Sequence, residues 1–433
     1  MQDETSKRKQ AARPLTVALV GFGTVGSSVA KLLCRDSAGP LRLTHIFNRD
    51  VARKKVSWVP AGVRWTEDIE EVLASDVDVI TELIGGLHPA GEWVRRALAS
   101  GKSVVTANKH LMAECGLELI SLAQKNGQRI EFGASVAGGI PALVGLQEGL
   151  AGDRLLRVAG ILNGTCNYIL SQMEARGISF AAALREAQEL GFAESDPSED
   201  LEGFDARAKL VILARAGLGV GLRTGEILCR SISSIEAADF VYARELNSTI
   251  RQISIVQKDS VNGSCVLAAV QPAVISLSSP MAHVRGNQNL VMAVGESGGE
   301  TSFIGCGAGG DPTAVAVVSD LLAIARESGV CAVRAPAEIV IPEKVSGEMT
   351  LPHFVRFTVQ DRPGIIAALA AILAGHSINI DAVLQKPGHA HSRLPFVMTL
   401  HACSSAVLDR ALEEMSQLDF HVQPPVCLPM LSS

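Results

Sequence analysis

Aromatic residues and long apolar runs are both scarce in this sequence. Only 4% of the 433 residues are aromatic, although 47% are hydrophobic, so we expect cores built from aliphatic side chains. No apolar run is long enough to cross a bilayer. The formal net charge of −6 gives no sign of a basic surface for nucleic acid. We therefore expect neither membranes nor nucleic acids as partners.

Export signals and disulfide patterns are lacking as well. The first residues, MQDETSKRKQAARP, are polar and have no apolar stretch like that of a secretory signal. The nine cysteines are odd in number, scattered and without metal-ligand spacing, which favours a reducing compartment over a disulfide framework. We expect a cytoplasmic protein in which residues 1–13 form a disordered arm.

The chain is long enough for about three domains of roughly 150 residues each. In the first, 14–140, short apolar segments alternate with helical ones, which is typical of an α/β fold with a parallel, doubly wound, Rossmann-like sheet. The expected strands are LTVALVG at 15–21, LRLTHIF at 41–47, VDVITELIG from 77, SVVTA at 103–107 and QRIEFGA at 128–134.

A glycine-rich hexamer follows the first of these strands and precedes a helix. It consists of Gly21, Phe22, Gly23, Thr24, Val25 and Gly26. In this context it predicts a dinucleotide site, because Gly21 makes a tight turn, Gly23 admits a pyrophosphate and Gly26 lets the helix pack closely. The N-terminus of the helix favours the phosphate charge.

The end of the second strand indicates which nicotinamide cofactor binds. An acid there binds the ribose hydroxyl of NAD, whereas an arginine accommodates the 2′-phosphate of NADP. Here the strand is followed by Asn48, Arg49 and Asp50, with Arg53 and Lys54 close behind. Arg49 and Lys54 favour NADP, and NAD is the alternative because Asp50 could turn inward.

Two further domains and a linker follow. Residues 141–325 combine strand signals, long helices and a glycine cluster before the helix TAVAVVSDLLAIARES, which predicts a mixed α+β catalytic and dimerisation domain. That helix could return to the first domain. Residues 326–350 are typical of a linker. From 351 to 433 the order of strand, helix, two strands and helix, with room for a last strand, predicts a ferredoxin-like domain.

The stretch AESDPSEDLEGFDARAKL, at 193–210, gathers several acids and one lysine. Asp205 and Lys209 are four residues apart, so on a helix they share a face and can pair. A lysine held by carboxylates beside a pocket can deliver a proton to developing negative charge, or hold an anion. A solvated, charged helix start is the alternative, since such pairs are common on surfaces.

A second candidate lysine follows another strand of the first domain. Thr106 lies at the end of the strand SVVTA and Lys109 just after it, at the carboxyl edge of the sheet, where ligands bind in such folds. An exposed lysine at a helix start is the alternative. His389 and His391 could form a metal pair, but a loop with incidental histidines is the simpler interpretation.

Together these motifs resemble the homoserine dehydrogenase family. The agreement runs from about Leu15 to Leu321. Its segments are GFGTVG, ELIGG at 82–86, GKSVVTANK at 101–109, ASVAGGIP at 134–141, GILNGTCNYIL at 160–170, the acid-rich stretch within 190–214 and GAGGDPTAVAVVSDL at 307–321. The last domain is similar to an ACT regulatory module, with the turn DRPG at 361–364.

The resemblance implies the reversible reduction of L-aspartate 4-semialdehyde to L-homoserine by NADPH or NADH, a step of threonine and methionine biosynthesis. Lys209 would donate the proton, Lys109 would position and polarise the substrate, and Asp205 would support the lysines. The other implied contacts are Glu194, Asp200, Lys109 and Gly164 for the substrate and, beside the hexamer, Thr106, Lys109 and Gly307 for the cofactor.

One position departs from the family. The family places a glutamate just before the ASVAGGIP-like run, where this chain has Gly133. By resemblance, that glutamate binds an alkali-metal ion together with the backbone carbonyls of Val136, Gly138 and Ile140. Without the glutamate the ion loses its only charged ligand, so we expect an impaired site, although Glu131 could partly substitute from the same strand face.

The resemblance also implies regulation and assembly. An ACT domain indicates an amino-acid effector, threonine by pathway logic, and a homodimer or homotetramer, with the effector near Asp361, Gly364 and Asn379. A domain that serves assembly alone is the alternative. Two other functions stay open: a cofactor-binding regulatory protein that has lost catalysis, and a different ACT-tailed dehydrogenase, which would not explain the acid-rich stretch.

Overall fold

The computed structural model describes residues 13–35, 39–258, 264–327 and 339–431. Nearly all of the expected arm at 1–13 and part of the expected linker at 326–350 therefore lie outside the described residues. The chain divides into two compact units, Met1–Gly145 with Ala308–Ala337, and Leu146–Gly307 with Glu338–Ser433. The segment 141–325, expected as one domain, is thus shared between the two units.

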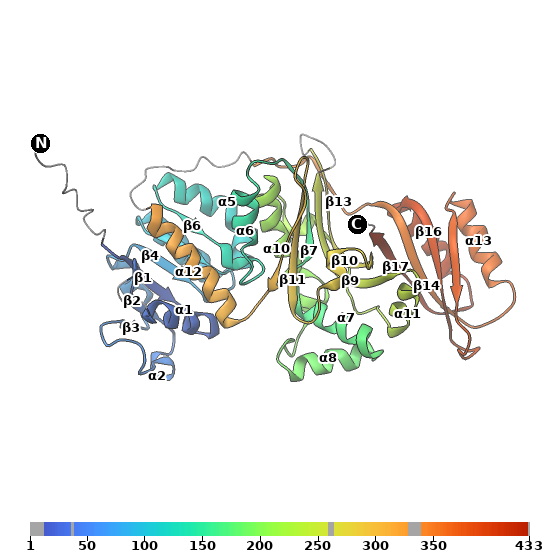
Figure 1. Ribbon diagram of the computed structural model, residues 1–433, viewed down its shortest axis with the longest axis horizontal. Coiled ribbons are helices and arrows are strands. Elements are labelled where there is room, and N and C mark those ends of the chain that lie inside the picture. The colour runs from blue at the N-terminus through green and yellow to red at the C-terminus, as the bar shows by residue number, and fades with distance from the viewer. Residues whose placement is uncertain (1–12, 36–38, 259–263, 328–338, 432–433) are drawn as a thin grey trace, which may run out of the picture. The chain divides into compact units, whose positions relative to one another are not determined.

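The N-terminal unit is built on a parallel sheet of six strands (Figure 1). The strands are β1 (Leu15–Val20), β2 (Leu41–Phe47), β3 (Arg64–Thr66), β4 (Val79–Glu82), β5 (Ser103–Thr106) and β6 (Ile130–Glu131). Their order, β3-β2-β1-β4-β5-β6, is that of dinucleotide-binding folds, which confirms the predicted fold class. The central strand β1 is apolar because both its faces are covered: Val17, Ala18 and Leu19 are 0% exposed.

The helices of this unit connect successive strands. They are α1 (Thr24–Arg35), α2 (Val51–Lys54), α3 (Ile69–Ala74), α4 (Ala90–Ala99), α5 (Lys109–Lys125) and α6 (Ala142–Val144), with α12 (Gly310–Glu327) added from later in the chain. Helix α12 packs on α1, where Ala314 and Val317 share a core with Val29. The Ser28 hydroxyl also donates to Asp311 at 2.7 Å. The helix at 310–327 therefore does return to the first domain.

The second unit contains a mixed sheet of eleven strands. Its path runs β12-β11-β7-β9-β10-β17-β14-β16-β15, and β8 and β13 pair with β10. The strands before the C-terminal region are β7 (Leu155–Ile161), β8 (Leu228–Cys229), β9 (Ser248–Lys258), β10 (Cys265–Ser276), β11 (Gln288–Gly295) and β12 (Gly299–Cys306). The helices are α7 (Gly164–Arg176), α8 (Phe180–Glu189), α9 (Ser198–Leu201), α10 (Phe204–Leu213) and α11 (Ala237–Glu245).

The C-terminal region has the predicted ferredoxin-like order and gains the last strand. Its elements are β13 (Lys344–Ser346), β14 (Thr350–Val359), α13 (Ile365–Gly375), β15 (Ile380–Gln385), β16 (Leu394–Ser404), α14 (Ser405–Ser416) and β17 (His421–Leu431). Figure 1 shows α13 beside the strands β14 and β16. No helix among the described residues combines the length and apolar character that a membrane span needs.

This C-terminal region shares a hydrophobic core with the rest of its unit. Phe354, Val397 and Leu428 pack in one cluster with Ile250 and Val274. All five side chains are at most 1% exposed. The region is therefore packed into the second unit rather than attached to it by a linker alone.

Candidate active site

The glycine hexamer forms the turn between β1 and α1. Gly21 has a φ of +111°, in the range that favours glycine, and a Cβ there would lie 2.9 Å from the Leu83 carbonyl. A Cβ at Gly26 would lie 2.2 Å from the Gly21 carbonyl oxygen, whereas one at Gly23 would meet no atom within 4 Å. Two glycines are thus needed by the protein, and Gly23 leaves open space of the kind that a pyrophosphate requires.

Polar groups at the ends of β4 and β5 fix the start of α5. Glu82 is 1% exposed, and its carboxylate accepts a hydrogen bond from Thr106 Oγ1 at 2.6 Å. Thr106 Oγ1 accepts the backbone N–H of Asn108, whose side chain caps α5 and donates to the Gly86 carbonyl at 2.6 Å. Lys109 is the first residue of α5. Sequence reasoning missed Glu82 and Asn108, although Glu82 ends β4 and Asn108 follows the neighbouring parallel strand β5.

The acid near the end of β2 has a local structural role. Asp50 Oδ1 accepts the backbone N–H of Arg53 at 3.0 Å and so caps α2. Its own backbone N–H donates to Asn48 Oδ1 at 3.1 Å. Arg49 and Lys54 are exposed. The carboxylate is used to cap a helix, while two basic side chains face solvent.

Asp205 and Lys209 pair on α10 in the second unit. Lys209 Nζ lies 2.8 Å from Asp205 Oδ2, and the two side chains are only 12% and 6% exposed. Lys209 Nζ also donates to the Leu162 carbonyl oxygen at 2.9 Å. The same carbonyl accepts Asn289 Nδ2 at 2.9 Å. The pair is therefore buried and held from two sides, unlike a solvated surface pair.

A second acid joins this cluster through an asparagine. Asn163 Nδ2 donates to Asp200 Oδ1 at 2.6 Å and to Asp205 Oδ2 at 2.9 Å. Burial raises the pKa of the Asp200 carboxyl above its ordinary value; the amide of Asn163 opposes that rise and the charge of Asp205 adds to it. Sequence reasoning missed Asn163 and Asn289, because nothing local in the sequence shows that they reach α10.

The remaining predicted substrate and cofactor residues of this unit are Gly164, Gly307 and Glu194. Gly164 begins α7, and a Cβ there would lie 3.0 Å from the Asn287 carbonyl oxygen. Gly307 lies against Asn289, since a Cβ would come within 2.1 Å of its Cγ. Glu194 is exposed on the loop after α8. The structure thus joins Asp205 and Lys209 directly, links Asp200 to Asp205 through Asn163 and places Glu194 on a more open loop.

The position expected to weaken an alkali-metal site lies beside a buried acid. A Cβ at Gly133 would come within 2.7 Å of Asp320 Oδ1. Burial raises the pKa of Asp320 to about 7, with the Glu131 charge adding to the rise. Glu131 pairs with Arg129 at 2.6 Å. The carboxyl next to Gly133 is therefore that of Asp320, and Glu131 is engaged elsewhere.

His389 and His391 of the C-terminal region are the pair that the sequence offers as candidate metal ligands. Across the described residues, no group of three or more His, Cys, Asp or Glu side chains is suited to a metal ion. His391 Nδ1 instead lies 2.7 Å from Asp361 Oδ2. The His391 ring is therefore in contact with a carboxylate of the turn at 361–364.

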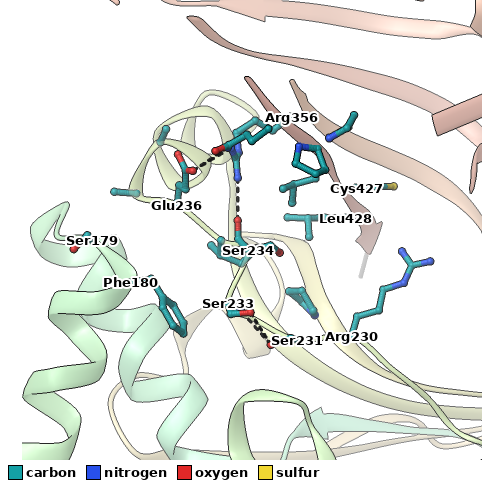
Figure 2. A pocket seen from close by; sticks show the side chains of 18 of the residues that line it. Ser179, Phe180, Arg230, Ser231, Ser233, Ser234, Glu236, Arg356, Cys427 and Leu428 are labelled. Carbon is teal, nitrogen blue, oxygen red and sulfur yellow. Dashed lines mark hydrogen bonds and ion pairs between the residues drawn. The ribbon is translucent and has the colours of Figure 1, made fainter. Parts of the chain in front are cut away.

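A groove of about 870 Å³ separates the segment 230–238 from β17. Figure 2 shows Arg356 of β14 reaching Glu236 and the Ser234 carbonyl, with Ser231 and Ser233 farther along the same segment. Arg356 Nε also donates to Asp239 at 2.6 Å in a pair whose side chains are at most 1% exposed.

On its other side this segment contacts α9. Ser231 Oγ and the Ile232 backbone N–H both donate to the Leu201 carbonyl, at 3.1 and 3.2 Å. Leu201 directly follows Asp200. Together with Asp239, which directly follows it, this segment (230–239) therefore connects the C-terminal region with the acid cluster.

Three family models match consecutive parts of the chain. Residues 21–133 match the homoserine dehydrogenase NAD-binding domain, 141–322 the homoserine dehydrogenase domain and 353–420 the ACT domain. Together they cover both the glycine hexamer and the Asp205–Lys209 pair.

Relatives of similar length carry the same name. Homoserine dehydrogenase of Bacillus subtilis is 36% identical, over 94% of this chain and 96% of that protein. Homoserine dehydrogenase of Neisseria gonorrhoeae is 35% identical, over 97% of this chain and 99% of that protein. The crystal structure of a homoserine dehydrogenase from Thiobacillus denitrificans has a TM-score of 0.88 at 33% identity, covering 97% of this chain and 99% of that one. An archaeal homoserine dehydrogenase in complex with NADPH has a TM-score of 0.62 at 27% identity, over 72% of this chain and 98% of that one.

The alternatives weighed from the sequence are not favoured, because the buried acid–lysine cluster is complete and near-full-length relatives share one activity. The chain belongs to the homoserine dehydrogenase family, NAD(P)-dependent oxidoreductases of a CH–OH group that interconvert L-aspartate 4-semialdehyde and L-homoserine.

Proposed function

We propose that Lys209 is the proton donor when the aldehyde is reduced. The observation that carries this is the buried contact of Lys209 Nζ with Asp205 Oδ2 at 2.8 Å, together with that to the Leu162 carbonyl at 2.9 Å. An ammonium group has three N–H bonds. Two are directed at these oxygens, and the third serves the substrate oxygen.

The proton and electron balance of this step is simple. When bound, the nicotinamide cofactor supplies the hydride that adds to the aldehyde carbon. The carbonyl electron pair moves onto oxygen, which takes a proton from the Lys209 ammonium. In the reverse direction neutral Lys209 accepts the hydroxyl proton. Asp205 stabilises the ammonium form and holds its nitrogen in place.

The other charged residues bind and orient the substrate. Asp200 and the exposed Glu194 receive its ammonium group, and the backbone at Gly164 lies against it. Lys109, held at the start of α5 by the hydrogen-bonded chain from Glu82 through Asn108, positions the substrate and polarises it.

The test of this assignment is Lys209→Ala. We expect kcat with L-aspartate 4-semialdehyde and NADPH to fall about a hundredfold or more, the usual effect of losing a general acid. Fluorescence titration should show unchanged NADPH binding. Lys209→Arg is the matched control for charge, since arginine keeps the ion pair with Asp205 but does not release a proton readily. Near-normal turnover of the alanine variant would show that another group donates the proton.

We also propose that NADP is preferred, with NAD as the alternative. The support is that Asp50 caps α2 while Arg49 and Lys54 are exposed beside the end of β2, where a 2′-phosphate would lie. The NADPH complex of the archaeal neighbour agrees with this. The remaining proposed cofactor contacts are the glycine hexamer, Thr106, Lys109 and Gly307.

The alkali-metal ligand set fits this chain only in part. The carbonyls of Val136, Gly138 and Ile140 are present in the sequence, but Gly133 supplies no carboxylate, and Glu131 is paired with Arg129. We therefore assign no catalytic step to such an ion and expect activity to depend little on sodium or potassium.

The ACT domain is proposed to bind an amino-acid effector, threonine by pathway logic, near Asp361, Gly364 and Asn379 in a homodimer or homotetramer. The support is the hydrogen-bonded route through segment 230–239, from Arg356 to the Leu201 carbonyl beside Asp200. An effector acts by its different affinity for two states of the enzyme. Lack of inhibition of the intact enzyme by L-threonine would instead favour an assembly role.

A cytoplasmic location is also proposed. All eight cysteines among the described residues are free thiols, as expected in a reducing compartment.

A further inference from the structure

Asn163 lies between the two acids of the active site. Its side chain is buried, at 3% exposure. One amide nitrogen serves both carboxylates, with Nδ2 at 2.6 Å from Asp200 Oδ1 and 2.9 Å from Asp205 Oδ2. The second of these oxygens, Asp205 Oδ2, is also the one that binds Lys209 Nζ at 2.8 Å.

The orientation of this amide is fixed by the start of α7. Asn163 Oδ1 accepts the backbone N–H of Cys166 at 2.8 Å and so caps the helix. With the oxygen committed to a donor, the NH2 group must face the carboxylates, and its two hydrogens provide one bond to each. The asparagine thus has two separate roles, as a helix cap and as a double donor.

The role as a double donor matters because the two acids carry like charges at a buried site. Asp205 is balanced by Lys209 at 2.8 Å. Asp200 contacts the amide of Asn163, and Asp205 lies near enough to oppose its ionisation. A donor to the charged form of a carboxyl favours that form.

We propose that Asn163 is a positioning residue, whose amide holds Asp200 and Asp205 as two ionised carboxylates, one ready for the substrate's ammonium and the other seated on Lys209. This inference rests on the roles proposed above for Asp200 and Lys209. It assigns Asn163 no contact with the substrate.

Asn163→Asp separates this role from the helix cap. Aspartate caps a helix as well as asparagine does, but an ionised carboxylate donates nothing and adds a third negative charge. Asn163→Ser is the second variant, which keeps a good cap without added charge and is too short to serve both acids. Ser179→Asp is the matched control, because Ser179 caps the neighbouring helix α8 from an exposed position.

The measurement is the pH profile of kcat/KM for full-length enzyme with L-aspartate 4-semialdehyde and NADPH. For Asn163→Ser we expect the acidic limb of the pH profile to move up by about one pH unit. The KM for the aldehyde should rise about tenfold. Both effects have the size expected for the loss of one hydrogen bond to a charged group. The KM for NADPH should not change. Asn163→Asp should shift the limb further, and Ser179→Asp should match the wild type.

The outcomes distinguish this inference from the function on which it rests. If Lys209→Ala keeps its turnover, the proposed proton donor is wrong whatever Asn163 does. If Lys209→Ala is inactive while Asn163→Ser folds and keeps the wild-type pH profile and KM, Asn163 is only a helix cap and this inference fails. Circular dichroism and thermal unfolding establish folding for each variant; if Asn163→Asp does not fold, Asn163→Ser decides.

Discussion

We expect the choice between the two cofactors to depend on single residues at the end of β2. Arg49→Ala should weaken the binding of NADPH about ten- to a hundredfold, because a hydrogen bond to a charged group is worth about 1.5–3 kcal/mol. NADH lacks the 2′-phosphate and should bind nearly as before. The measurement is KM for each cofactor at saturating aldehyde, with Arg42→Ala as control, since Arg42 is exposed at the other end of the same strand. Equal losses for both cofactors would mean that Arg49 does not contact the phosphate.

At the level of single residues, the sequence predicted contacts between residues close in the chain better than contacts between distant ones. The Asp205–Lys209 pair follows from helical spacing alone, and the structure has it at 2.8 Å. Asn163 reaches Asp205 across 42 positions in the chain, so only the folded chain shows their contact. Asp50 illustrates the same limit, because its capping of α2 depends on a helix of four residues that has almost no signal in the sequence.

Among the elements, an apolar run between turn signals was predicted as a strand, and a largely polar strand was missed. The strand at 41–47 was predicted with the bounds of β2, since it is an apolar run between turn signals. The strand β12 was not predicted because it is GETSFIGC, whose residues are all exposed or half-buried. β6 keeps only two of the seven residues expected as a strand, because the chain turns at Gly133 into a short 3₁₀ helix.

The strand β14 contains a histidine that should make stability depend on pH. His353 is 2% exposed, and burial lowers its pKa to about 4, with the Arg230 charge adding to the effect. The unfolded chain binds a proton near pH 6.5, so the stabilisation is present above that pH and is lost as the pH falls towards 4. Between pH 7.5 and 5 the loss should be about 2 kcal/mol in the free energy of unfolding.

Urea unfolding at both pH values checks this. His353→Gln should remove about 2 kcal/mol of the pH dependence, whereas His401→Gln, on the exposed part of β16, should keep it. An unchanged pH dependence in the His353 variant would show that this ring is not buried in its neutral form.

For the molecule as a whole, the structure changes the expectation that the last domain can be removed. The linker expected at 326–350 and the ferredoxin-like pattern expected from 351 would together predict that truncation near Lys344 leaves an active dehydrogenase. In the structure Phe354, Val397 and Leu428 belong to a core shared with β9 and β10, and Arg356 neutralises the buried Asp239. Composition cannot reveal that two segments share a core.

Truncation after Lys344 should therefore destabilise the second unit. Leaving Asp239 buried without Arg356 should alone cost about 3–5 kcal/mol, and the exposed core adds to this. Thermal unfolding of the fragment should begin at a temperature well below that at which the full chain unfolds. The full-length variant Arg356→Met measures how much of this destabilisation comes from loss of the ion pair alone. A fragment that unfolds at the full-length temperature would show that the domain is separable.

The strand β17 has a consequence for association between chains. It pairs with β10 at only two residue pairs, Val274↔Met430 and Ile275↔Leu431, so most of that edge borders the groove of Figure 2. An open strand edge is a template on which another chain can add a strand. Three of the eleven residues of β17 are prolines, which have no N–H to offer. The enzyme can thus keep a gap within its sheet without inviting aggregation there.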